Sequence, residues 1–172
     1  MKIPLAAVLL GAFALQAQPY INYRGIANAA SYTPPGLSGS EIAQGSIFSI
    51  SGSNLGPATP VQVSAFPLSK TLAGVSVKVT QGSTSVDALP LIVTASRIIA
   101  IMPSTTPLGP VSISVMFNGV TSNPGTATVA TSSFGIFATN SGGFGPGILQ
   151  NYISANNKPT NSLSATVTSK FT

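Results

Sequence analysis

The chain has 172 residues, of which 44% are hydrophobic, and its charged residues are seven Lys or Arg and two acids, Glu41 and Asp87. It contains no His, Cys or Trp, which excludes a Ser-His-Asp triad, a cysteine nucleophile, a Cys/His zinc site and a disulfide framework. Two acids are also too few for a typical calcium cage, which needs about 6–8 oxygen ligands. We therefore expect a protein that is not an enzyme and that has no cofactor or metal.

Residues 1–17 predict a secretory signal peptide. Lys2 supplies a short positive region, residues 3–15 are almost entirely apolar, and a small residue offers cleavage after Ala17 or, in a closer A-x-A match, after Ala14. The apolar run has the length of a signal-peptide core and falls short of the roughly 20 residues needed to cross a bilayer. We expect a secreted or cell-surface protein with no integral membrane span after signal removal.

The net charge of +5 reflects scarce acids rather than abundant bases. The basic residues are scattered along the chain and form no cluster that could follow a phosphate backbone. We therefore expect no nucleic-acid partner.

Residues 18–44 form a lead-in segment with turn signals at 34–36, in which Ala27, Ala29, Ala30 and Tyr32 could form an edge strand. From Gly45 onward, short β-prone runs alternate with turn residues. Residues 46–51 and 75–80 alternate between apolar and polar side chains, as half-buried strands do, whereas the runs 88–94 and 97–102 are apolar throughout and predict strands with both faces partly covered.

The strongest local signal is a hairpin. Residues 111–117 alternate and are followed by Asn118-Gly119, the favoured pair for a type I′ turn, and then by returning strands at 120–122 and 126–131. Six or seven short strands without a convincing amphipathic helix predict an all-β sandwich over residues 45–137. Its expected core residues are Phe48, Ile50, Val75, Val77, Val79, Leu91, Ile98, Ile113, Val115 and Phe117.

Residues 138–172 have too few apolar positions for a core of their own. Residues 142–147 are glycine-rich but lack the G-x-G-x-x-G spacing of a phosphate-binding turn. We interpret this region as an irregular extension, consisting of a linker and an incomplete second β unit.

Four segments resemble a known module. Residues 26–32 (IANAASY), 44–57 (QGSIFSISGSNLGP), 72–77 (LAGVSV) and 132–137 (SSFGIF) resemble a module found at the ends of many uncharacterised exported proteins of acidobacteria. Residues 52–56 are also similar to IPT/TIG-type immunoglobulin-like domains. The resemblance covers about residues 25–150 and implies an Ig-like β-sandwich, usually appended to larger secreted or surface proteins, with no catalytic residues to carry over.

This sequence departs from that family in two ways. Members generally continue past the glycine-rich segment into a second β unit, whereas this chain stops at Thr172, and here the module follows the signal peptide almost directly. Both departures suggest a minimal or truncated member, so a fragment of a longer surface protein stays an alternative.

Two groups of residues are candidates for a site. Gly52, Asn54, Gly56 and Pro57 could form a ligand loop, but we favour a turn in which glycine accepts positive φ. Tyr20, Tyr23 and Tyr152 fall in predicted loops or near the ends and form a tentative ligand surface. The sequence thus predicts a non-enzymatic, structural or adhesive module with an unknown extracellular protein or glycan as partner, and carbohydrate binding as the alternative.

Overall fold

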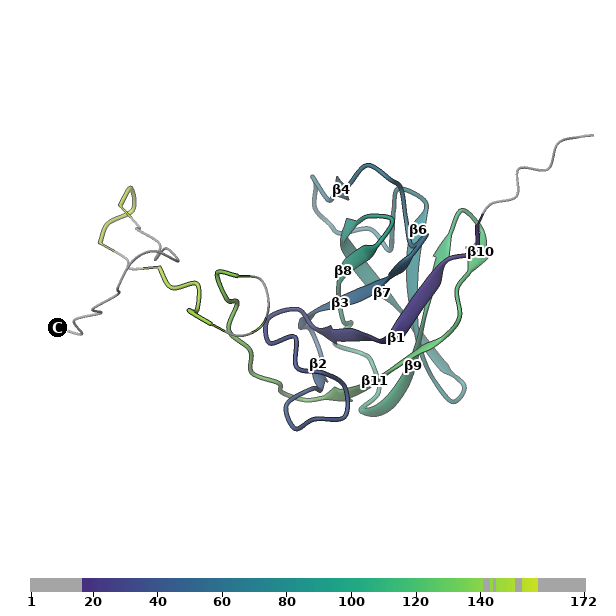
Figure 1. Cartoon of the computed structure of the whole chain (residues 1–172), viewed down its shortest axis with the longest axis horizontal. Coiled ribbons are helices and arrows are strands. Elements are labelled where there is room, and N and C mark those ends of the chain that lie inside the picture. Colours follow the sequence, from purple (N-terminus) through teal and green to yellow (C-terminus); the bar gives the residue numbers. More distant parts are fainter. Residues whose placement is uncertain (1–16, 141–142, 144, 151–152, 158–172) are drawn as a thin grey trace, which may run out of the picture.

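The computed structural model describes residues 17–140, 143, 145–150 and 153–157 of the chain. The predicted signal peptide up to residue 16 lies outside the described residues, as does Tyr152. Every regular element in the described ranges is a β-strand, and the strands form two packed layers (Figure 1). None of these residues forms a helix long and apolar enough to cross a membrane. The prediction of an all-β protein is confirmed.

The first layer, sheet A, is antiparallel. In spatial order it contains β1 (Tyr20–Asn28), β3 (Ile47–Ser53), β8 (Arg97–Ile101), the second half of β7 (Thr84–Val93) and the short β4 (Val61–Gln62).

The second layer, sheet B, begins at the first half of the same strand β7. It continues through β6 (Val75–Gln81), β9 (Gly109–Phe117), β11 (Gly125–Ala130) and β2 (Ile42–Ala43), with β5 (Thr71–Leu72) beside β6 and β10 (Val120–Thr121) beside β9. Because β7 bonds into both layers, the strands form one hydrogen-bonded sheet that folds over on itself.

A side chain joins the two layers at the opposite seam. Asn123, just before β11, accepts a hydrogen bond from the backbone N–H of Ile21 in β1 (2.7 Å) and donates one to the backbone oxygen of the same residue (2.9 Å). The amide group thus takes the place of a partner residue in a β-ladder. This bridge gives the sandwich a barrel-like closure.

The core lies between the layers and draws on both. Of the ten core residues expected from the sequence, Phe48, Ile50, Val75, Val77, Val79, Ile98, Ile113 and Val115 are buried. Phe117 is half-buried and packs against this cluster. Leu91 differs, because the register with β8 shifts between Pro90 and Ile92 and the extra residue breaks the alternation, which leaves Leu91 half-buried outside the core.

The predicted hairpin is confirmed. Val120 pairs with Phe117, and the two turn residues have positive φ, 48° at Asn118 and 84° at Gly119, as a type I′ turn requires.

The strand expected in the lead-in segment lies earlier than predicted. β1 ends at Asn28, and the chain turns over the next residues instead of continuing as a strand to Tyr32. Ile21 and Ile26 of β1 belong to the core. The pairing with β3 breaks between these two residues, where Arg24 has a φ of 54°, and this break hides the alternation in the sequence.

The turn after β3 forms as expected but for a different reason. Asn54, and neither Gly52 nor Gly56, takes positive φ, and Leu55 is fully buried in the core. A Cβ at Gly52 would meet the backbone oxygen of Tyr20, and one at Gly56 would lie 3.0 Å from the backbone oxygen of Thr94. These two glycines therefore allow close approach of neighbouring backbone.

Candidate functional site

Two depressions on the surface carry residues with the chemistry of a binding site. The first, which we call the tyrosine groove, has a volume of about 490 Å³ and lies beside the break in β1. It is lined by Tyr20, Ile21, Asn22, Tyr23, Arg24, Pro35, Gly36 and residues 123–126.

The tyrosine groove brings together two of the three tyrosines selected from the sequence. Tyr20 is 52% exposed and Tyr23 is 86% exposed. The guanidinium carbon of Arg24 lies 5.4 Å from the centre of the Tyr23 ring, within the range of a cation–π contact. The groove therefore offers aromatic faces beside amide and guanidinium donors, although the amide of Asn123 is already occupied by Ile21.

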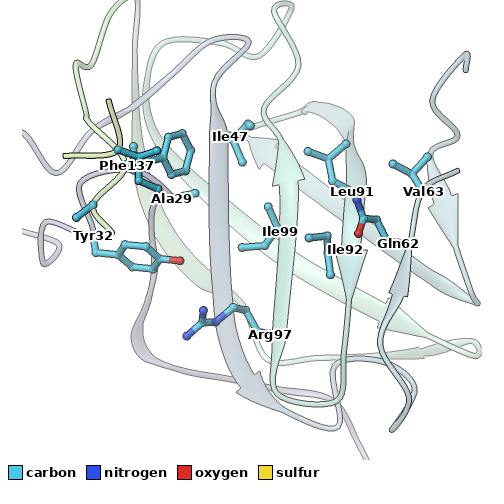
Figure 2. A pocket seen from close by; sticks show the side chains of 13 residues that line it. Ala29, Tyr32, Ile47, Gln62, Val63, Leu91, Ile92, Arg97, Ile99 and Phe137 are labelled. Carbon is cyan, nitrogen blue, oxygen red and sulfur yellow. The ribbon is translucent and has the colours of Figure 1, made fainter. Parts of the chain in front are cut away.

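The second depression, which we call the apolar groove, has a volume of about 400 Å³ and lies on the outer face of sheet A (Figure 2). Its floor comes from β3, β7 and β8 and includes Ile47, Leu91, Ile92 and Ile99. In Figure 2, Gln62 and Val63 lie at one side, Ala29, Tyr32 and Phe137 lie at the other, and Arg97 lies at one end. Ala30, Ala138 and Ile148 complete the lining.

The turn between β7 and β8 fixes Arg97 at the edge of the apolar groove. The hydroxyl of Thr94 accepts hydrogen bonds from the backbone N–H groups of Ser96 (3.3 Å) and Arg97 (2.8 Å) and donates one to the backbone oxygen of Arg97 (2.9 Å). Such side-chain to backbone bonds are typical of threonine in tight turns. They make Arg97 the first residue of β8.

A second turn, after β1, places Tyr32 opposite Arg97. The buried side chain of Asn28 accepts hydrogen bonds from the backbone N–H groups of Ala30 (2.9 Å) and Ser31 (3.3 Å), and the backbone N–H of Tyr32 donates to the oxygen of Asn28 (2.9 Å). Tyr32 adopts a φ of 48°. The guanidinium carbon of Arg97 then lies 5.9 Å from the centre of the Tyr32 ring, and Figure 2 shows the two side chains converging at one end of the groove.

Sequence reasoning missed the apolar groove. The continuous apolar runs in β7 and β8 predicted strands covered on both faces, and the outward residues Leu91, Ile92 and Ile99 are indeed half-buried. What the sequence did not reveal is that the cover comes in part from Phe137, Ala138 and Ile148 and stops short of filling the face.

No family model and no curated protein matches the chain. Among solved structures, the chain is similar to a bacterial protein from Bacteroides vulgatus described as a candidate DNA binding protein, with 16% identity over 67% of this chain and a TM-score of 0.43. This chain spans about half (49%) of that protein's length. It is also similar to the Lin-41 filamin domain, with 11% identity, 67% of this chain and 100% of that domain covered, and a TM-score of 0.33.

Proposed function

We propose that the chain is an exported, non-enzymatic module of the immunoglobulin-like, IPT/TIG-related type, with a structural or adhesive role at the cell surface. The observation that carries this proposal is a run of exposed apolar side chains after the sandwich, which we call the apolar segment, residues 134–153. The large apolar residues that the structure describes in it are all about half exposed or more, and they are Phe134, Ile136, Phe137, Ile148, Leu149 and Ile153. Large apolar side chains that are exposed in number, rather than singly, typically mark an interaction site.

The beginning of the apolar segment is held against the sandwich. Ser133 donates a hydrogen bond from its hydroxyl to the backbone oxygen of Glu41 (2.6 Å), and a Cβ at Gly135 would lie 2.9 Å from the Cβ of Ala30. Farther along, the backbone N–H of Ile148 donates to the oxygen of Phe137 (2.6 Å). These contacts hold Phe134, Ile136, Phe137 and Ile148 in a defined arrangement, as a docking surface for a neighbouring protein requires.

The proposal is tested by producing the full chain in a bacterial host and following its export and its retention on the cell surface. We expect the protein outside the cytoplasm, with a new N-terminus after Ala17 or Ala14, and partly attached to cells. Phe134→Ser should release it into the medium, whereas Phe66→Ser, which changes an equally exposed phenylalanine (85% against 86%) outside the apolar segment, should not. A cytoplasmic protein that keeps Met1, or equal release by both variants, would overturn the proposal.

Carbohydrate binding is the second candidate, and it is favoured by the geometry of the tyrosine groove. Tyr20 and Tyr23 line one depression together with Asn22 and Arg24. Aromatic rings combine apolar faces with a polar handle, and amide and guanidinium groups supply hydrogen bonds to hydroxyl groups.

A glycan array probed with the chain tests this second candidate. Tyr23→Ala should abolish any signal, and Tyr32→Ala, which removes a tyrosine outside the tyrosine groove, should leave it intact. An array without signal, or equal loss in both variants, would count against sugar binding.

A further inference from the structure

The outer face of sheet A is unusual for a two-layered sandwich. An antiparallel sheet with one face on the core normally presents polar side chains on the other. Here each of three neighbouring strands presents an outward isoleucine, Ile47 in β3, Ile92 in β7 and Ile99 in β8, and all three are only half-buried. Ile99 pairs with Ile92 across the ladder, so their side chains form a continuous apolar floor.

One end of this floor carries a cation without a counter-charge. The chain has two acidic residues, and neither Glu41 nor Asp87 lines the apolar groove. Asp87 pairs with Lys70 at 3.3 Å, in a different depression. Among the residues that the structure describes, the guanidinium of Arg97 forms neither an ion pair nor a hydrogen bond, and its one recorded partner is the ring of Tyr32. A guanidinium stacked on a ring keeps the N–H groups along its edge, and these match a carboxylate.

We propose that the apolar groove binds an amphipathic carboxylate, such as a medium-chain fatty acid, whose acyl chain lies over Ile99 and Ile92 and whose carboxylate contacts Arg97. The volume of about 400 Å³ is within the range of small-molecule sites. The apolar lining supplies affinity for the acyl chain, and the unpaired positive charge selects the anionic head group. Both parts of the ligand therefore correspond to a feature of the groove.

The test is a titration of the full chain with decanoate, followed by the NMR shifts of the backbone amides in β8. We expect saturable shifts at Ile99 and its neighbours. Decanol, which lacks the charge, and decyltrimethylammonium, which reverses it, should bind at least about tenfold more weakly, because a hydrogen bond to a charged group is worth more than 1 kcal/mol. Binding that is equally strong for decanol, or shifts outside the apolar groove only, would overturn the proposal.

Matched variants distinguish the contribution of the Arg97 charge to binding from that of the apolar floor of the groove. Arg97→Gln should weaken decanoate binding about tenfold, Arg97→Lys should restore part of it, and Ile99→Thr should weaken decanoate and decanol alike. Arg24→Gln is the control, because Arg24 also stacks on a tyrosine but lies in the tyrosine groove. Equal losses in Arg97→Gln and Arg24→Gln, with both variants folded by circular dichroism, would contradict the proposal. Tighter binding of a peptide with an apolar C-terminus than of decanoate would also contradict it. Because the readout is binding by the purified chain, it is independent of export and surface retention.

Discussion

The two outer faces of this sandwich differ in chemistry although their inner faces are alike. On sheet B, the outward residues of β6 and β9 are mainly hydroxyl-bearing or charged, as in Ser76, Lys78 and Ser114. On sheet A, isoleucine or leucine faces outward in each of β3, β7 and β8, as in Ile47, Leu91 and Ile99, beside the serines of β3 and Arg97 at the start of β8. Sheet B therefore has the pattern of a solvated face, whereas the pattern of sheet A indicates a surface that something covers.

The largest expected effect concerns the inner faces, where the two sheets should behave alike. Ile98 of sheet A and Ile113 of sheet B are both fully buried (0% exposed) in one core. Ile98→Ala and Ile113→Ala should each lower the free energy of unfolding by about 3 kcal/mol, because each removes buried methyl groups and leaves a cavity. Chemical denaturation measures both. A loss below about 1 kcal/mol in either variant would mean that the layers do not share one core.

A smaller effect is expected at the seam where the two sheets meet without a ladder. Asn123→Asp removes the donor to the backbone oxygen of Ile21 and places a negative charge beside that oxygen. The free energy of unfolding should fall by about 2 kcal/mol, since a partly buried backbone group loses its partner. Asn118→Asp, which changes an asparagine in the exposed hairpin turn, is the control and should cost less. Equal losses would show that the bridge contributes nothing particular to closure.

Whether a strand and its core residues could be predicted from the sequence depended on whether the outward face of that strand is polar. Val75, Val77 and Val79 alternate with polar residues because one face of β6 is exposed to solvent. The strand and its core residues could therefore be predicted from the alternation alone. In β7 and β8 both faces are apolar, so alternation does not identify the inner one, and the register shift after Pro90 moved Leu91 away from the core.

The candidate sites were less predictable than the fold. Tyr20 and Tyr23 were selected from the sequence as polar-context aromatics, and the break in β1 brings them to one groove. The Tyr32–Arg97 pair could not be predicted, because it joins two turns far apart in the chain, and each turn is set by a side chain, Asn28 or Thr94, that bonds locally to the backbone.

A change in the polarity of one side chain should alter the free energy of unfolding more on the outer face of sheet A than on that of sheet B. Ile99→Thr keeps a β-branched residue in β8 but removes apolar surface from a half-buried position, and it should cost about 1 kcal/mol. Ser114→Val makes the opposite change on sheet B and should alter the free energy of unfolding by less than about 0.5 kcal/mol. Urea denaturation of the two variants compares the faces directly. If Ile99→Thr were as silent as Ser114→Val, the outer face of sheet A would be as solvated as that of sheet B.

The smallest expected effect comes from the ion pair of sheet B. Lys70 and Asp87 lie 3.3 Å apart, but their side chains are 69% and 38% exposed, so water screens the attraction and the lysine loses side-chain freedom in forming it. Lys70→Met should therefore change the free energy of unfolding by less than about 0.5 kcal/mol, and added salt should not alter the difference between variant and parent measurably. A loss above 1 kcal/mol that disappears at high salt would show that the charges on sheet B stabilise the fold as strongly as the apolar face of sheet A. In that case solvation would not be what distinguishes the two outer faces.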